Sequence, residues 1–227
     1  MIDILLNNPY RILGVYSTSS QRDIVANQAK MKAFLKVGKD VSFELDLPHF
    51  LPVVERNVEI IAKAIADLSL ANEQIKYAQF WFANKTQFDE IAIGKLADGD
   101  INAAIDILKK KENPSSLQNL IVCGLIQNNL SDALCYAEKL YTSYLEDFLH
   151  MILGDNATVS SVHLVNAFLD TICANFQSED IISCLTIPDW KGYVRDRIIN
   201  PVLDNISSAI ERSKSTKGQS PDDRYAA

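Results

Sequence analysis

The 227 residues are enough for one large or two small domains, and a hydrophobic content of 48% is ample for a packed core. Only 8 Gly and 7 Pro interrupt a sequence rich in helix-forming residues, which favours an all-α fold over a strand-and-turn architecture. The net charge of -7 gives no overall electrostatic support for binding nucleic acid.

The sequence has no targeting or membrane signal that we can recognise. No apolar run reaches the roughly 18 residues that a bilayer span requires. Residues 1–8 lack the basic and apolar regions of a signal peptide. We therefore expect a cytoplasmic protein without a membrane partner.

The first helices are predicted by their end signals. Asn7 or Asn8 can cap a short helix with Pro9 in its first turn, and Gly14 can end it in the left-handed conformation. A capping box between Ser20 and Asp23 opens a second helix over residues 20–38. Its expected apolar face consists of Ile24, Val25, Ala29, Ala33, Phe34 and Val37.

Two prolines interrupt helical periodicity over residues 39–52, which predicts a loop. From Val53 to Leu68 the apolar residues recur at intervals of three and four, so we expect a third helix that packs antiparallel on the second. A fourth helix is expected over residues 72–83. The consecutive aromatic residues Phe80 to Phe82 are expected to form core at a junction between domains.

Beyond Asn84 the sequence indicates paired helices. Residues 96–105 align with residues 125–134 at an offset of 29, and each stretch reads as a helix end, a polar turn and a new helix. Two helical hairpins in succession are therefore predicted.

Further helices are expected over residues 162–172, from Ser178 to Leu185, and from Pro188 onward, with Pro201 kinking or restarting the last. The segment Ser220-Pro221-Asp222-Asp223 has the composition of a helix start. Residues 214–227 are thus expected to be either a polar tail or the start of a further segment.

The first third of the sequence resembles a J-domain, the helical module of DnaJ-type co-chaperones. The resemblance is carried by Asn8-Pro9-Tyr10-Arg11-Ile12-Leu13-Gly14-Val15, the basic second helix, and Ala64-Ile65-Ala66-Asp67-Leu68. The hairpins resemble tetratricopeptide repeats. These resemblances imply a J-domain-like module over residues 1–84 and a hairpin array over residues 85–213.

The J-domain resemblance also implies which residues would contact a partner. J-domains use a His-Pro-Asp tripeptide between the second and third helices to stimulate an ATPase chaperone. Here the loop reads Asp46-Leu47-Pro48-His49, with the residue types in altered order. The basic helix would present Lys32, Lys36, Lys39 and Arg22 to an acidic surface.

The expected function is therefore a non-enzymatic scaffold or adaptor that binds another protein, with no cofactor. One alternative is a co-chaperone that stimulates a heat-shock ATPase. A second is an enzyme with a site near His150 and His163, although no catalytic or phosphate-binding motif is present. The four cysteines lack metal-ligand spacing and are expected to be buried free thiols: Cys123, Cys135, Cys173 and Cys184.

Overall fold

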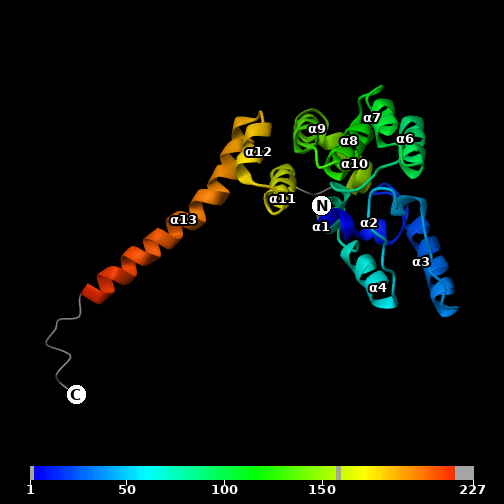
Figure 1. The fold of residues 1–227 in the computed structure, drawn as a ribbon, viewed down its shortest axis with the longest axis horizontal. Coiled ribbons are helices and arrows are strands. Elements are labelled where there is room, and N and C mark those ends of the chain that lie inside the picture. The colour runs from blue at the N-terminus through cyan, green and yellow to red at the C-terminus, as the bar shows by residue number, and fades with distance from the viewer. Residues whose placement is uncertain (1–2, 157–159, 218–227) are drawn as a thin grey trace, which may run out of the picture.

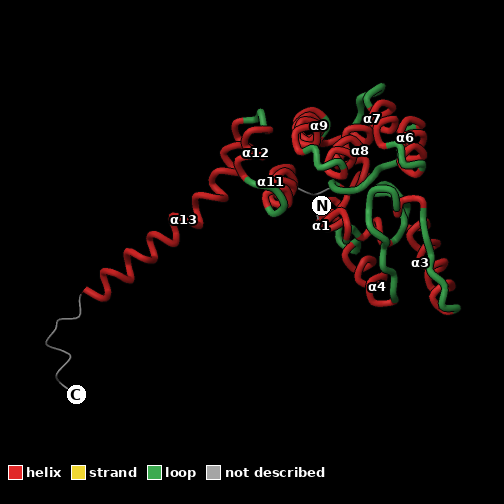
Figure 2. Tube along the Cα trace, in the orientation of Figure 1, coloured by secondary structure: helices red, strands yellow, loops and turns green. Residues whose placement is uncertain are grey.

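The computed structural model describes residues 3–156 and 160–217, which contain helices and no strand, so the expected all-α class is confirmed (Figures 1 and 2). The N-terminal helices are α1 (Asp3–Leu6), α2 (Pro9–Ile12), α3 (Gln21–Lys36), the 3-10 turn η1 (Glu44–Asp46), α4 (Val58–Asp67) and α5 (Ala71–Ala78). They are followed by α6 (Gln87–Ala97), α7 (Ile101–Leu108), α8 (Pro114–Ile126), α9 (Leu130–Ser143) and α10 (Leu145–Leu153). The last elements are η2 (Gly154–Asn156), α11 (Ser161–Cys173), α12 (Ser178–Cys184) and α13 (Pro188–Lys217).

The predicted end signals of the first helices are confirmed. The Asn8 side chain accepts a hydrogen bond from the Tyr10 N–H, and Gly14 has a φ of 66°. The side chain of Ser20 accepts from the Asp23 N–H, while the Asp23 carboxylate accepts from the Ser20 N–H, which completes the capping box. These contacts are local, so the sequence order alone brings the partners together.

The expected antiparallel pairing of α3 and α4 is wrong. The two helices do not pack along each other, and α4 lies on α2 instead (Figure 1). The chain between α3 and α4 returns to the body and contributes Val41, Leu45, Leu47 and Leu51 to the core. Because this loop takes the core position next to α2, it leaves α3 at the periphery.

Two helix boundaries also differ from the prediction. Asn57 caps α4 by accepting from the Ile60 N–H, so residues 53–57 are not helical. The fourth helix stops at Ala78, and Phe80, Trp81 and Phe82 follow it with no exposed surface. Phe80 stacks on Phe168 with ring centroids 5.3 Å apart, which confirms that the aromatic residues are core.

The two predicted hairpins are confirmed as α6 with α7 and α8 with α9. Their turns are equivalent, with Gly99 at φ 86° and Asn128 at φ 57°, 29 positions apart. In each turn the next residue caps the second helix: Asp100 accepts from the Ala103 N–H and Asn129 from the Asp132 N–H. Gly124 allows close helix packing, since an added Cβ would lie 3.0 Å from the Ala133 nitrogen.

The C-terminal helices α11 and α12 lie beside α13, and the rest of α13 projects from the body (Figure 1). α13 continues through Pro201 as one helix, so the expected restart does not occur. The segment Ser220-Pro221-Asp222-Asp223 lies outside the described residues.

Candidate functional site

Helix α3 is attached to the body through one narrow side. Met31 is buried and Ile24 and Leu35 are half-buried on this side. The Asn27 amide donates hydrogen bonds of 3.0 Å to the carbonyl oxygens of Leu13 and Gly14. Because these residues recur at three and four along the helix, they fix which side of α3 faces solvent.

The expected apolar face of α3 is therefore partly wrong. Val25 is 52% exposed, Phe34 is 37% exposed and Val37 is 67% exposed. The sequence pattern is ambiguous because apolar residues surround much of the helix, and the loop after α3 contacts only one of the possible sides.

The outward side of α3 combines basic and small apolar residues. We call this stripe the α3 surface; it comprises Arg22, Val25, Ala29, Lys32 and Lys36, all exposed. The members are three or four positions apart and lie on one side of the helix. Lys39 lies just after the helix and is also exposed, beyond Gly38 at φ 64°. None of the ion pairs between described side chains involves Lys32, Lys36 or Lys39.

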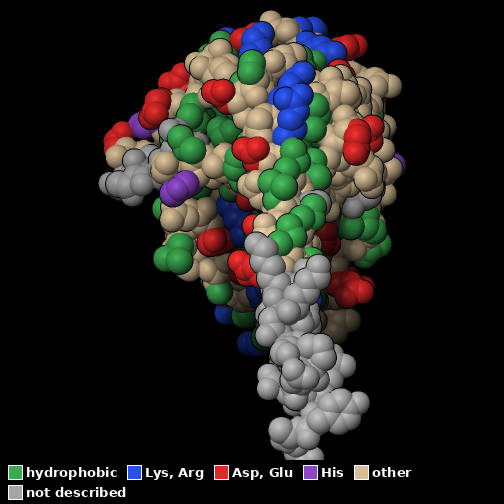
Figure 3. Space-filling view, turned by 90° about the vertical axis from the view of Figure 1, so that its left-hand side faces the viewer, with side chains coloured by type: hydrophobic (Ala, Val, Ile, Leu, Met, Phe, Trp, Pro, Cys, Tyr) green, Lys and Arg blue, Asp and Glu red, His purple; other side chains and the backbone are tan. Residues whose placement is uncertain are grey.

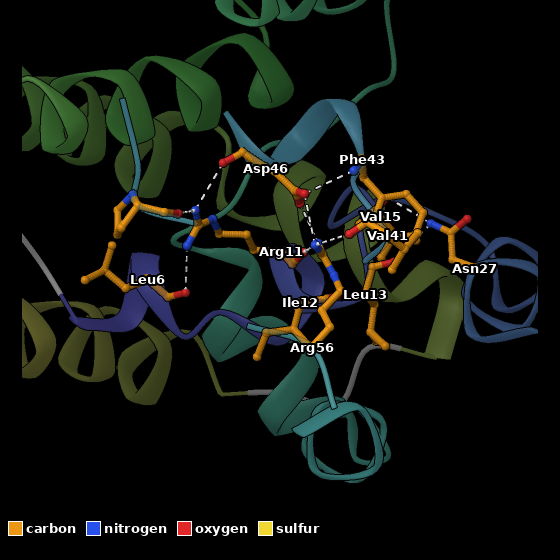
Figure 4. A network of polar contacts seen from close by, with 12 residues as sticks. Leu6, Arg11, Ile12, Leu13, Val15, Asn27, Val41, Phe43, Asp46 and Arg56 are labelled. Carbon is orange, nitrogen blue, oxygen red and sulfur yellow. Dashed lines mark hydrogen bonds and ion pairs between the residues drawn. The ribbon is translucent and has the colours of Figure 1, made fainter. Parts of the chain in front are cut away.

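Asp46, which the J-domain resemblance assigns to partner contact, is used inside the molecule (Figure 4). Its carboxylate forms an ion pair with Arg56, including a bond of 2.9 Å from Arg56 Nη1 to Asp46 Oδ2. The Arg56 guanidinium also donates to the carbonyl oxygens of Arg11 and Ile12, and it lies 4.9 Å from the centre of the Phe43 ring. The ion pair thus fixes the loop against α2.

Arg11 is a second buried guanidinium in this network, and sequence reasoning did not single it out. It donates to the carbonyl oxygens of Leu6, Asp46 and Pro52 at 3.0, 3.1 and 2.6 Å. Burial lowers the pKa of Arg11 to about 10, and the Asp46 carboxylate only partly offsets this effect. No carboxylate of the described residues accepts a hydrogen bond from Arg11, so its guanidinium binds three backbone carbonyl groups and holds these segments together.

Pro48 and His49 are exposed, in contrast to Asp46. The His49 ring lies against the turn of the first hairpin, where an added Cβ on Gly99 would be 3.2 Å from its Cγ. The predicted contact residues are therefore divided between a buried ion pair, a loop beside the α6–α7 turn, and the exposed α3 surface.

His150 and His163, the residues of the enzymatic alternative, do not line a common cavity in the described part of the chain. His150 Nδ1 lies 3.3 Å from the Asp155 carboxylate, and both side chains are exposed. His163 is exposed on α11, and neither imidazole lines the cavity beside α4 or the cavity beside α11. Within residues 3–156 and 160–217, no three His, Cys, Asp or Glu side chains are placed to hold a metal ion.

The expectation that all four cysteines are buried is wrong. Cys123 is buried, which raises the pKa of its thiol to about 12. Cys135 is exposed, and Cys173 and Cys184 are half-buried. Cys135 lies on the outer side of the second helix of its hairpin, which the apolar sequence pattern did not distinguish from the inner side.

Comparison with family models, with curated proteins and with solved structures gave no match to this sequence. None of the helices in the described part of the chain has both the length and the apolar character to cross a membrane.

Proposed function

We propose that this protein is a non-enzymatic interaction scaffold whose α3 surface binds an acidic surface of a partner protein. The observation that carries the proposal is a set of exposed lysines on and just after a peripheral helix, in a chain with net charge -7: Lys32, Lys36 and Lys39. None of them forms an ion pair with another side chain in the described part of the chain. A local basic stripe in an acidic protein favours one orientation of an acidic partner and repels others.

The apolar residues of the α3 surface support the proposal. Exposed Val25 and Ala29 lie between Arg22 and the lysines, so a partner would bury apolar area in the middle and pair charges around it. Interfaces commonly combine an apolar centre with a polar rim. We infer that the hairpins α6–α7 and α8–α9 act as the rigid support, in the manner of the repeat arrays they resemble.

The experiment is a pull-down from native lysate that compares the wild type with the variant Lys32→Glu/Lys36→Glu/Lys39→Glu. We expect the variant to lose a partner that the wild type retains, with an unchanged melting temperature. A matched control is Lys109→Glu/Lys110→Glu/Lys111→Glu. These three lysines are exposed directly after α7, and their substitution changes the net charge by the same amount. Identical partners for all three proteins would contradict the proposal.

A co-chaperone role is the second candidate, supported by the exposure of Pro48 and His49. It is weaker than the scaffold because the Asp46 carboxylate is bonded to Arg56 and is not free for an ATPase. Adding the protein to a heat-shock ATPase should leave the rate of hydrolysis unchanged. A rate increase that is lost on Pro48→Ala/His49→Ala would favour the co-chaperone.

A further inference from the structure

The projecting part of α13 carries a row of exposed aliphatic side chains. Ile199, Leu203, Ile206 and Ile210 are each about half exposed, between 48% and 52%. Figure 3, in which this side of the molecule faces the viewer, shows hydrophobic side chains gathered along the projecting helix. We call these four residues the α13 stripe.

The spacing within the α13 stripe is four, three and four residues. This alternation keeps side chains on one side of an α-helix and is the spacing that two helices use when they pack as a coiled coil. Pro201 lies on the opposite side of the helix, so its ring and its missing N–H do not obstruct a helix packed on the stripe.

We propose that the α13 stripe binds the α13 stripe of a second copy of this chain in an antiparallel arrangement. A spacing of four, three and four reads the same in both directions. A twofold axis near the middle of the stripe would therefore place Ile199 of one copy opposite Ile210 of the other, and Leu203 opposite Ile206. Each of the four side chains meets an aliphatic partner, as a self-complementary interface requires.

The charge distribution along the stripe permits a second copy to bind. Positions that flank a coiled-coil stripe usually hold the charges that select a partner. Between Ile199 and Ile210 the flanking residues Asn200, Ser207 and Ala209 are uncharged, so these positions add no repulsion between two copies, despite the net charge of -7. In the antiparallel arrangement Asn200 of one copy faces Ser207 of the other, and both can form hydrogen bonds.

The antiparallel direction also suits the shape of the molecule. The body lies at the N-terminal end of α13, and the helix projects away from it (Figure 1). Antiparallel packing places the two bodies at opposite ends of the paired helices, whereas parallel packing would bring them side by side. Because the stripe is shorter than the three to four heptads of a stable coiled coil, we expect a weak, reversible dimer.

Sedimentation equilibrium of the full chain over a range of concentrations tests the proposal. We expect dimers to form between roughly 10 µM and 1 mM, the range of a small interface. The variant Leu203→Asp/Ile206→Asp should associate at least about a hundred-fold more weakly, because each carboxylate would be buried against an aliphatic partner. The matched control Asn205→Asp/Ser208→Asp adds the same charge on the opposite side of α13 and should dimerise like the wild type.

Cysteine crosslinking tests the direction. A mixture of the Leu203→Cys and Ile206→Cys proteins should form a disulfide between the two different chains, with the parent chain and its native cysteines as the blank. Crosslinks only between like chains would overturn the antiparallel arrangement. A wild type that stays monomeric at about 1 mM, or equal association of the two Asp variants, would overturn the dimer itself.

Discussion

The side chain of Arg56 connects α2 with the loop between α3 and α4, two segments that local sequence patterns do not relate to each other. It contacts the backbone of α2, the Phe43 ring and the Asp46 carboxylate, and only 4% of its surface is exposed. The sequence offered no signal for this network, since helical periodicity and the J-domain resemblance assign no buried contact to Arg11 or Arg56. Ion pairs between loops depend on the tertiary path of the backbone, which periodicity does not describe.

We expect Asp46→Ala to lower the free energy of unfolding by about 3 kcal/mol, because it leaves the Arg56 guanidinium buried without its carboxylate. Urea unfolding monitored by fluorescence measures the change. Asp40→Ala is the control, since Asp40 is exposed in the same loop and should have little effect. Equal stability of the two variants would mean that the Asp46 carboxylate is free for another role.

Substitution of two glycines with the same backbone conformation distinguishes the cost of backbone strain from the cost of a steric clash. Gly14 and Gly38 have φ values of 66° and 64°, but an added Cβ would be 2.2 Å from the Phe43 ring only at Gly14. Gly38→Ala should cost about 1 kcal/mol from the left-handed conformation alone. Gly14→Ala should cost at least about 2 kcal/mol more, since the ring must move. Similar unfolding midpoints for both variants would show that Phe43 is not held in place.

At the scale of the elements, the caps of the first helices were more predictable than the packing of α3. The caps at Asn8 and Ser20 depend on residues within three positions, so the sequence contains the whole interaction. The side of α3 that faces the core depends on Leu13, Gly14 and the returning loop, which are distant in the sequence or lack periodicity. This is why the exposed positions of Val25 and Ala29 could not be identified from the pattern of apolar residues, although the basic residues of the α3 surface were expected to be exposed.

The equivalent turns of the two hairpins hold different residues at the left-handed position, which allows a comparison. Asn128 adopts the left-handed conformation that Gly99 adopts in the first hairpin, and its side chain is exposed. Asn128→Ala should lower the free energy of unfolding by about 1 kcal/mol, whereas Asn128→Gly should be neutral or slightly stabilising. Thermal unfolding of the two variants tests this difference. Equal effects would mean that the loss of the Asn side chain, not the backbone conformation, determines stability.

At the scale of the whole molecule, buried amides connect the two predicted domains. Asn119 of α8 accepts from the Ala83 N–H at 2.8 Å and donates to the Ala83 carbonyl at 2.9 Å. Gln118 donates to Ser17 Oγ at 3.0 Å. A domain boundary after residue 84 was predicted because the pattern of paired helices begins there. Such a pattern does not reveal polar contacts between segments that are more than 30 positions apart.

We therefore expect residues 1–84 and 85–213 to unfold together. In a Trp190→Phe background, the fluorescence of Trp81 reports unfolding of the N-terminal part. Chemical labelling of the buried Cys123 thiol, measured from the mass of its peptide, reports unfolding of α8. The two probes should give the same free energy of unfolding within about 1 kcal/mol. Breaking the Asn119 and Gln118 contacts leaves buried backbone groups of the N-terminal part unpaired, and it leaves the two buried amide side chains of α8 unpaired as well. A clearly lower value from either probe would instead support independently stable domains joined at residue 84.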